Sequence, residues 1–532
     1  MKKKNSVESA GGGFISGVFV LSLSTLIVKI IGLAFKIPML RLLGMEGMGY
    51  FNSAYEIYAL LCVVSTAGLP VALSILVSSA RASENDIEIA GTYKAARRTF
   101  FFFGLLGSLA MLLLAKPISH WIGNEDAFYC ILAIAPALLF ICLASAIRGY
   151  CQGFEDMKPT AISQLIEALL KLLLGVGLAV VGLKRGLSIP MVSALSVLGI
   201  TVGTFFSLCY LTFAKRKHKV SIQRARPDRK SYKELIKIAL PITLGSAVIS
   251  LTRIFDMTFI MRRLQDVGVS QFRANEIYGA YTTLALPVFS LIPSLIAPIS
   301  MALIPELAGF IKKNNEVGQI ASVEKALRLT SVLAMPASIA VTVFSRQILS
   351  LLFNGQSEAI DIAAPLLSLL GASVLFSCLI TTTNAILQAY RCVGMPIFSM
   401  SVGVAVKAFT SYFLLGTRPL GAYGAPLGSL ACNVTVVLLN FALILRFVKC
   451  ADRGITVLKS FVKPFFASVL SIGAAYAAFV GLLKMNFSEL IAFAAAIAVA
   501  ILLYCLFVAL LGIIGKDDLK LIPIVGKLIK EE

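Results

Sequence analysis

The sequence predicts an all-α polytopic membrane protein with about fourteen transmembrane helices, and three observations carry this prediction. The chain has 532 residues, of which 58% are hydrophobic and only 14% are charged, whereas soluble domains carry about 25% charged residues. Apolar runs that approach or exceed the length needed to cross a bilayer recur along the chain. Lys and Arg gather in alternate connecting segments, as the positive-inside rule predicts for a protein with many spans.

Fourteen apolar segments are predicted to cross the membrane. The first, which starts at Phe14, is too long for a signal peptide and lacks a small-residue cleavage site, so we expect it to be a span. Span 278–304 contains Pro287, Pro293 and Pro298, which fit either hinges in a moving protein or simple kinked packing. The predicted spans are 14–35, 54–80, 99–115, 128–147, 161–182, 189–213, 238–260, 278–304, 324–345, 359–387, 397–416, 426–445, 464–483 and 490–513.

The segment 215–237 is strongly basic, with ten Lys or Arg in 23 residues. It has no apolar run of its own and lies between long apolar segments, so we expect it to stay in the cytoplasm. With both termini cytoplasmic, the predicted inner segments hold 33 Lys or Arg and the outer segments hold 11. This linker separates an N-terminal lobe (1–214) from a C-terminal lobe (238–450), which a helix pair (451–515) and a cytoplasmic tail (516–532) follow.

Each predicted lobe has six spans, so both lobes enter the membrane from the same side. Any internal repeat is therefore parallel, with a pseudo-twofold axis along the membrane normal. One supporting match is that Gln152 precedes Lys171 by 19 residues, just as Gln388 precedes Lys407 by 19 residues. A duplicated transporter of this kind binds its substrate between its halves, near the middle of the membrane.

Charged side chains within predicted spans are candidate functional residues, because each costs about 3 kcal/mol at the centre of a bilayer. Glu167 and Lys171 are four residues apart, so they can pair on one face of their helix. Arg253 and Asp256 are three residues apart and can pair in the same way. For both pairs, a purely structural ion pair carries about the same weight as a functional role.

Two further lysines, Lys29 and Lys407, have no carboxylate nearby within their own spans. Lys29 is near enough to the end of its span to extend its ammonium group towards the interface, whereas Lys407 is in mid-span. Together the six intramembrane charges sum to +2, which suits an anionic ligand, and a phosphate-bearing one above all. An exporter of organic cations is expected to have an excess of carboxylates instead.

Several other classes of protein are disfavoured. His120 and His218 are the only histidines, and the cysteines show no CxxC spacing, so we expect no metal site. The chain has no P-loop sequence, and its soluble segments are too short for a catalytic domain, so we expect no enzymatic activity and no cofactor. The net charge of +21 fits the positive-inside bias better than nucleic-acid binding.

Fourteen spans in two six-helix halves with a trailing pair resemble the MOP exporter superfamily, which includes drug exporters and flippases for lipid-linked sugars. The segment Thr25–Leu73 is similar to its polysaccharide biosynthesis branch. The segment from Arg148 to Glu167, RGYCQGFEDMKPTAISQLIE, resembles the SpoVB/MurJ-like lipid II flippase group. The resemblance implies a V-shaped pair of lobes around a cationic cavity, in the bacterial cytoplasmic membrane. It also implies transbilayer movement of an undecaprenyl-pyrophosphate-linked glycan.

The resemblance further implies site residues. The first helix of MurJ-type members carries two basic residues around a glycine, and Lys29, Gly32 and Lys36 match this pattern with Lys in place of Arg. Lys cannot hold a phosphate in a bidentate way. MurJ-type chains also carry an Asp soon after this helix, where the present chain has Asn52. By the same analogy, the last two helices line a groove for the lipid tail. The expected cationic cavity comprises Lys29, Lys36, Arg253 and Lys407.

The predicted function is therefore alternating-access transport of a lipid-linked glycan pyrophosphate, most simply lipid II, with Na⁺, H⁺ or the membrane potential as possible driving forces. Membrane lipids are the other expected partners. A cation-coupled multidrug exporter on the same fold is one alternative. A non-transporting membrane scaffold for cell-wall or spore assembly is another. A glycan polymerase is disfavoured because it needs a sizeable external loop.

Overall fold

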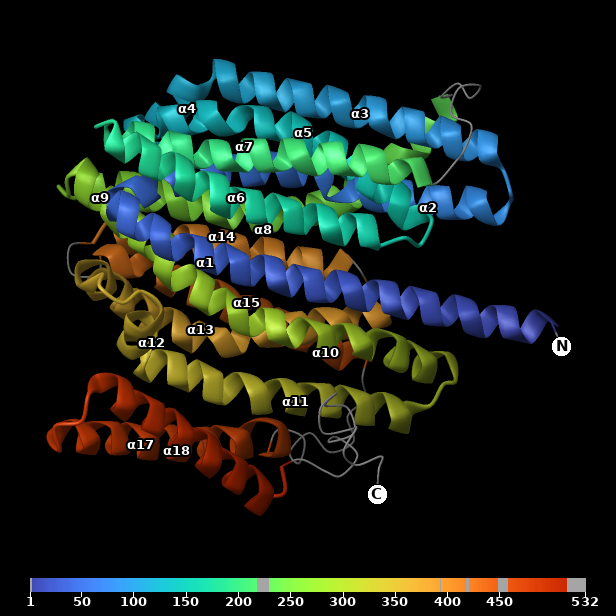
Figure 1. The fold of residues 1–532 in the computed structure, drawn as a ribbon. Helices are drawn as coiled ribbons and strands as arrows, with labels where there is room; N and C mark the ends of the chain where they lie inside the picture. The colour runs from blue at the N-terminus through green and yellow to red at the C-terminus, as the bar shows by residue number, and fades with distance from the viewer. Residues whose placement is uncertain (1, 218–228, 393, 418–420, 448–457, 514–532) are drawn as a thin grey trace. The chain divides into compact units, whose positions relative to one another are not determined.

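The computed structural model describes residues 2–217, 229–392, 394–417, 421–447 and 458–513. Within these residues the elements are helical and no strand is present, which confirms the predicted all-α fold (Figure 1). The middle of the predicted basic linker, 218–228, and the whole of the predicted tail, 516–532, lie outside the described residues.

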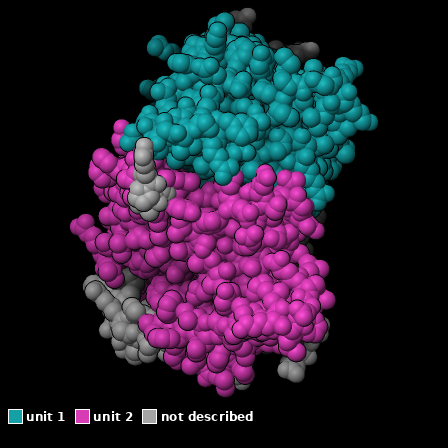
Figure 2. Space-filling model, turned by 90° about the vertical axis from the view of Figure 1, so that its left-hand side faces the viewer, with its two compact units in different colours: residues 1–283 teal, residues 284–532 magenta. Residues whose placement is uncertain are grey.

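The chain divides into two compact units, which Figure 2 colours teal and magenta. The first unit ends at Thr283 and includes two helices that follow the basic linker, α8 (Arg229–Asp266) and α9 (Gln271–Ala280). Both pack against the helices at the beginning of the chain, which is why they belong to that unit. The lobes predicted from the sequence, 1–214 and 238–450, stay a prediction.

The first unit begins with a helix of 65 residues, α1 (Lys2–Thr66), followed closely by α2 (Gly68–Ala82). The axis of α1 is broken at Gly44, whose φ of 65° and ψ of −174° are not helical. A positive φ costs glycine little because it has no Cβ. The break separates the two predicted spans 14–35 and 54–80, so α1 supplies the first span and, with α2, the second.

The other helices of the first unit begin where the local sequence favours a helix start. Pro159 lies in the first turn of α6 and Pro190 in that of α7, where a missing N–H costs nothing. The Asn85 side chain accepts a hydrogen bond from the backbone N–H of Glu88 and caps α3. These helices are α3 (Asp86–Leu113), α4 (Ala115–Ile122), α5 (Phe128–Gly153), α6 (Lys158–Lys184) and α7 (Ile189–Ala214).

The second unit continues directly from α9 through a π-helical turn, Tyr281–Ala285. Its later helices α17 and α18 are the pair that the sequence sets outside the duplication, and they pack against each other and against α11. The helices of this unit are α10 (Leu286–Lys312), α11 (Glu316–Val343), α12 (Ser345–Leu352), α13 (Ser357–Ala389), α14 (Gly394–Leu415), α15 (Gly424–Phe447), α17 (Lys463–Lys484) and α18 (Glu489–Leu510).

Twelve helical segments among the described residues are long and apolar enough to cross a membrane. One of them, Ile27–Arg81, contains the whole of the second predicted span and the last part of the first, because α1 and α2 follow each other almost without interruption. The predicted span 238–260 lies within α8, which is not among the twelve. The class of multi-pass membrane protein is thus supported, while the count of fourteen spans stays a prediction.

Candidate functional site: buried charges in the first unit

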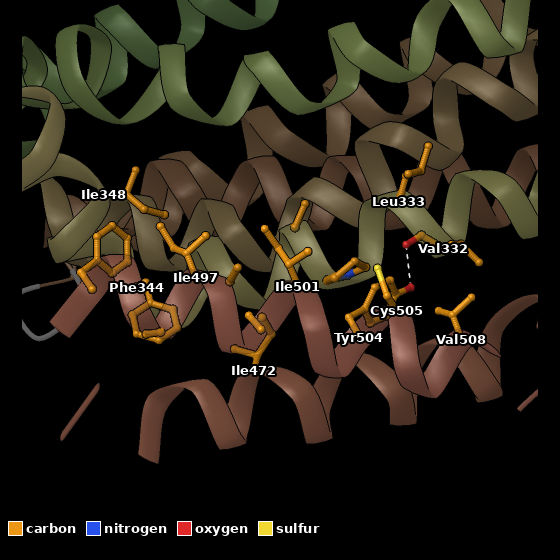
Figure 3. Close-up of a pocket in the computed structure, with 16 residues that line it drawn as sticks. Val332, Leu333, Phe344, Ile348, Ile472, Ile497, Ile501, Tyr504, Cys505 and Val508 are labelled. Carbon is orange, nitrogen blue, oxygen red and sulfur yellow. Dashed lines mark hydrogen bonds between the residues drawn. The ribbon is translucent and has the colours of Figure 1, made fainter. Parts of the chain in front are cut away.

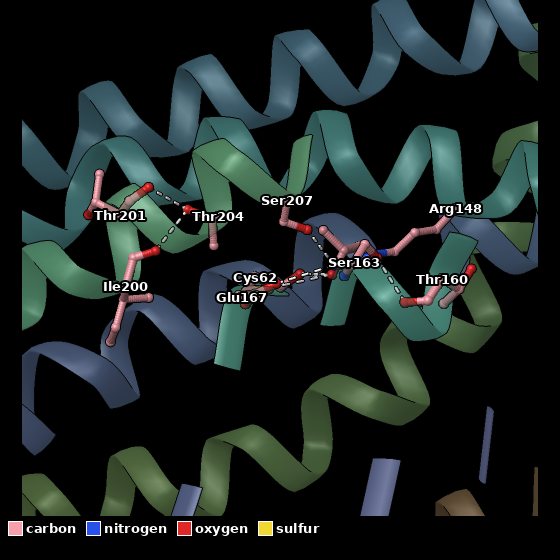
Figure 4. A network of polar contacts seen from close by, with 10 residues as sticks. Cys62, Arg148, Thr160, Ser163, Glu167, Ile200, Thr201, Thr204 and Ser207 are labelled. Atoms are coloured by element: carbon pink, nitrogen blue, oxygen red, sulfur yellow. Dashed lines mark hydrogen bonds and ion pairs between the residues drawn. The ribbon is translucent and has the colours of Figure 1, made fainter. Parts of the chain in front are cut away.

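A network of polar contacts joins α5, α6 and α7 around the guanidinium group of Arg148 (Figure 4). Arg148 Nη2 lies 3.2 Å from Glu167 Oε2, and Arg148 Nε donates to Ser163 Oγ at 3.0 Å. Arg148 Nη2 also donates to Ser207 Oγ at 3.1 Å. The Arg148 side chain is 11% exposed and that of Glu167 is 26% exposed. Charge-assisted hydrogen bonds of this kind hold a buried ion pair in one geometry.

The partner of Glu167 in this network differs from the one that the sequence predicts. Spacing within one helix favours Lys171, whereas the ion pair in the structure is with Arg148 of α5. The rule for residues four apart considers one helix only, and the forked guanidinium of a neighbouring helix offers several N–H donors at once.

The ammonium group of Lys171 lies among aromatic rings instead. Its Nζ atom is 4.9 Å from the ring centroid of Phe35, 5.6 Å from that of Phe51 and 4.9 Å from that of Tyr55. The negative faces of such rings attract a cation, and more strongly where water is excluded. The sequence places Lys171 on α6, and three side chains of α1 therefore give it an environment that spacing alone does not predict.

A second set of charges lies where α1 meets α8 and the π turn. Lys36 Nζ donates to the backbone carbonyl of Thr282 at 2.7 Å. Arg253 Nη1 lies 3.7 Å from Glu56 Oε2, and the exposed fractions of the two side chains are 54% and 12%. Asp256, which the sequence pairs with Arg253, accepts a hydrogen bond from Tyr281 Oη at 3.4 Å.

Glu56 and Arg148 are members of the charged set that the sequence did not single out as site residues. Glu56 was overlooked because it opens a predicted span, where a charge is ordinary. Arg148 directly follows the predicted span 128–147, where a charge is also ordinary, although it stands in the motif that carries the family resemblance. Each is identified only by its ion-pair partner on another helix, which is Arg253 for Glu56 and Glu167 for Arg148.

The four residues predicted to form a cationic cavity fall into both compact units. Lys29, Lys36 and Arg253 belong to the first unit, where Lys29 and Arg253 are exposed and Lys36 is half-buried. A Cβ atom added at Gly32, between the two lysines of α1, would meet no atom within 4 Å. Lys407 belongs to the second unit and is 7% exposed.

The second unit also contains a buried polar cluster, and this one consists of amide and hydroxyl groups. Asn440 Nδ2 donates to Thr383 Oγ1 and to Asn384 Oδ1, each at 2.9 Å. Thr330 and Thr382 share a hydrogen bond of 2.7 Å between their hydroxyl groups. Such neutral pairs hold helices together within a membrane without a charge.

An apolar cavity of about 550 Å³ lies within the second unit, between α11, α12, α17 and α18 (Figure 3). A polar contact at its wall is the Tyr504 hydroxyl, which donates to the carbonyl of Val332 at 2.6 Å. Its walls are otherwise largely apolar and include Pro336, Phe344, Ile348, Ile472, Phe493 and Ile501. Among the described residues, no group of three or more His, Cys, Asp or Glu side chains is placed to hold a metal ion.

The helical fold and its long apolar helices define a polytopic membrane protein, and comparison with known proteins gives its family. The family model for "Polysaccharide biosynthesis protein" matches residues 14–311, and the chain belongs to this family. It is 25% identical to stage V sporulation protein B of Bacillus subtilis (strain 168), over 97% of this chain and 99% of that protein. It is 24% identical to the lipid II flippase MurJ of the same strain, over 81% of this chain and 82% of that protein.

Solved structures share the fold. A lipid II flippase MurJ in an inward closed conformation matches 93% of this chain and 98% of its own, with a TM-score of 0.74 and 17% sequence identity. An inward-facing multidrug resistance MATE family transporter of the MOP superfamily matches 79% of this chain and 98% of its own, with a TM-score of 0.66 and 15% identity. These likenesses confirm the predicted MOP-superfamily fold, and a fold alone does not select a substrate.

Proposed function

We propose that this protein is a flippase that moves an undecaprenyl-pyrophosphate-linked glycan, such as lipid II, across the bacterial cytoplasmic membrane by alternating access. Homology to MurJ and to stage V sporulation protein B supports the broader class, a membrane flippase family for lipid-linked glycans. The specific cargo, both termini in the cytoplasm and the mechanism belong to the proposal. Its role is transport, and no residue is assigned to catalysis.

The observation that carries the proposal is the positive stripe on α1. Lys29 and Lys36 are seven residues apart, two helical turns, so they lie on one face with Gly32 between them. The space beside Gly32 is open, and Lys29 is exposed. A pyrophosphate offers several anionic oxygens to such a pair of ammonium groups.

The charges around this stripe are unevenly balanced. Arg253 lies beside Glu56, and Lys36 is held by a neutral carbonyl. With Lys29, and with Asp256 beside the π turn, this makes three cations and two carboxylates, a surplus of one positive charge that favours an anionic headgroup. An exporter that binds organic cations is expected to have an excess of carboxylates instead.

The lipid tail needs an apolar surface, and the cavity beside α17 and α18 supports this part of the proposal. Its volume of about 550 Å³ and its largely hydrophobic walls suit a segment of a polyprenyl chain. The tail can also stay in lipid during transport, so the cavity guides it rather than enclosing all of it.

The driving force is left among three candidates: Na⁺, H⁺ and the membrane potential. Moving one charge across the membrane is worth about 2.3 kcal/mol per 100 mV, which is enough to bias a transition between two states. A carrier with surplus positive charge responds to the potential when empty and less so when its cargo neutralises that charge. The potential therefore favours the return of the empty carrier, alone or together with Na⁺ or H⁺.

The experiment is lipid II translocation in proteoliposomes, read by accessibility of the headgroup to a membrane-impermeant probe. Wild-type protein should move lipid II, and Lys36→Ala should lose this movement. Lys184→Ala is the matched control because Lys184 is an exposed lysine at the end of α6, and it should behave as wild type. Absence of movement in vesicles where a known flippase works, together with efflux of an organic cation, would replace the proposal with drug export.

A further inference from the structure

The helix that leads from α9 into α10 contains one π-helical turn, Tyr281–Ala285. Short π turns are rare and are found frequently at functional sites. Here the turn has a particular position in the chain, since the boundary between the two compact units, after Thr283, falls within it. The chain therefore passes from one unit to the other through a locally irregular helix.

The π turn leaves one backbone carbonyl without its usual helical partner. In a π turn the carbonyl of residue i accepts from the N–H of residue i+5. For Thr282 that residue is Pro287, in the first turn of α10, and proline has no N–H. A buried carbonyl without a donor is costly, so another group must satisfy it.

The donor is the ammonium group of Lys36, whose Nζ atom lies 2.7 Å from the Thr282 carbonyl oxygen. Asn52, beyond the Gly44 break of α1, holds the same turn through its side chain. Its Nδ2 donates to Thr282 Oγ1 and to Thr283 Oγ1, each at 2.9 Å. Asn52, Thr282 and Thr283 are all buried. Both helical parts of α1 are thus fastened to the π turn.

We propose that Lys36 couples binding of an anionic headgroup to the π turn, so that the turn acts as a hinge that the ligand releases. This inference rests on the proposed function, because it deepens the role of one residue of that site. A pyrophosphate oxygen is a stronger acceptor for an ammonium group than a neutral carbonyl. When the ligand draws Lys36 away, the Thr282 carbonyl loses its donor and the turn loses stability, while Asn52 keeps the segment attached to α1.

Lys36 is in this view a positioning residue as well as a ligand contact, and hydrogen–deuterium exchange separates the two roles. The protein is placed in nanodiscs, and exchange is followed by mass spectrometry in the peptide 278–292. The probe is farnesyl pyrophosphate, a short prenyl pyrophosphate. In wild-type protein the probe should raise exchange in this peptide about tenfold, as expected for loss of a hydrogen bond to a charged group.

Lys36→Met tests the contact without the probe, because Met keeps the length of the side chain and removes the donor. Exchange in peptide 278–292 should already be about tenfold faster than in wild type and should not change when the probe is added. Lys29→Met is the matched control on the same helix face. It should weaken the response to the probe and leave exchange without the probe at the wild-type level.

Pro287→Ala supplies a backbone N–H at position 287 and so offers the turn an alternative donor. In this background, adding Lys36→Met should change exchange by less than about twofold, because the carbonyl no longer depends on Lys36. The same loss of protection for Lys36→Met in both backgrounds would overturn the inference. So would wild-type protection of the peptide in Lys36→Met alone.

The result also distinguishes the inference from the proposed function on which it rests. If the probe has no effect on wild-type protein but Lys36→Met exposes the turn, the contact controls the hinge and the anionic ligand is wrong. If the probe binds and exchange in the peptide does not respond, the ligand class stands and the hinge is wrong.

Discussion

Two stretches of the chain, one in each unit, have helices of the same order and length but different polar side chains. In the first unit α3 has 28 residues and the short helix α4, directly after it, has 8. In the second unit α11 has 28 residues and α12, directly after it, has 8. Each long helix is preceded by a residue with positive φ, Glu84 at 53° and Asn314 at 51°. This agreement supports the duplication that the sequence predicts.

The agreement extends to the motif that first indicated a repeat. Gln152 is followed three residues later by Glu155, with φ of 63°, and Gln388 is followed three residues later by Arg391, with φ of 60°. Glu155 and Arg391 each lie in the connection to the helix that carries the repeated lysine. Lys171 and Lys407 therefore occupy corresponding positions in the two stretches, as the predicted repeat requires.

The side chains around these positions differ in charge. Arg148 lies four residues before Gln152 and forms the ion pair with Glu167, whereas Asn384 lies four residues before Gln388 and accepts from an amide. Glu167 lies four residues before Lys171, and Gly403 occupies that position before Lys407. One backbone plan thus supports a charged network in the first unit and a neutral one in the second. The two stretches share the order and length of their helices, while their polar side chains differ.

The largest expected effect comes from breaking the charged network. Arg148→Ala leaves the carboxylate of Glu167 without its partner, and we expect the free energy of unfolding to fall by about 3 kcal/mol. Asn384→Ala, at the equivalent position, removes one neutral acceptor and should cost about 1 kcal/mol. Chemical denaturation in detergent micelles measures both. Equal losses of unfolding free energy in the two variants would mean that the charged network stabilises its unit no more than the neutral network does.

A smaller loss of stability is expected when a side-chain carbon is added at Gly403, the position that corresponds to Glu167. A Cβ atom at Gly403 would lie 2.4 Å from Val436 Cγ2, so Gly403→Ala forces α14 and α15 apart and should cost about 1–3 kcal/mol. Gly473→Ala on α17 is the matched control, because its Cβ would meet no atom within 4 Å. The same denaturation series gives both values. A neutral Gly403→Ala would show that this helix pair has room for a side chain.

The smallest change in stability is expected when the ammonium group of Lys171, which lies among aromatic rings, is removed. Lys171→Met retains the length of the side chain and removes the charge, so the lost cation–π attraction is offset by the lost cost of burying an ion. We expect the free energy of unfolding to change by about 1 kcal/mol or less. A thermal melt of the purified protein checks this. A loss several times larger would indicate that the aromatic contacts of Lys171 are a main support of the first unit.

Much of this architecture follows from the sequence, and the reasons are physical. Apolar length predicts helices that cross a membrane, and the spacing of Gln152 and Lys171 against Gln388 and Lys407 predicts the repeat. Partners across helices were predicted less well, because periodicity describes one helix at a time. It therefore did not indicate Arg148 as an ion-pair partner of Glu167, and it did not single out Glu56 beside Arg253.

The π turn shows a different limit of the sequence. Pro287 signals that a carbonyl loses its donor, and a kink or hinge in that span was an expected reading. The sequence does not show which carbonyl is affected, since that depends on whether the helix runs in the α or the π register. Nor does it show that Lys36, about 250 residues earlier, supplies the missing donor. Both facts depend on helices that meet only in the folded chain.

The central claim is that Lys29 and Lys36 of α1 hold an anionic lipid headgroup. The most direct test is the dissociation constant of undecaprenyl pyrophosphate, measured by native mass spectrometry, for Lys29→Ala and Lys36→Ala. Each variant should bind about tenfold more weakly than wild type, as loss of a charge-assisted contact predicts. Undecaprenol, which has no phosphate, should bind all of them alike. Equal affinity of wild type and variants for the pyrophosphate would contradict the claim.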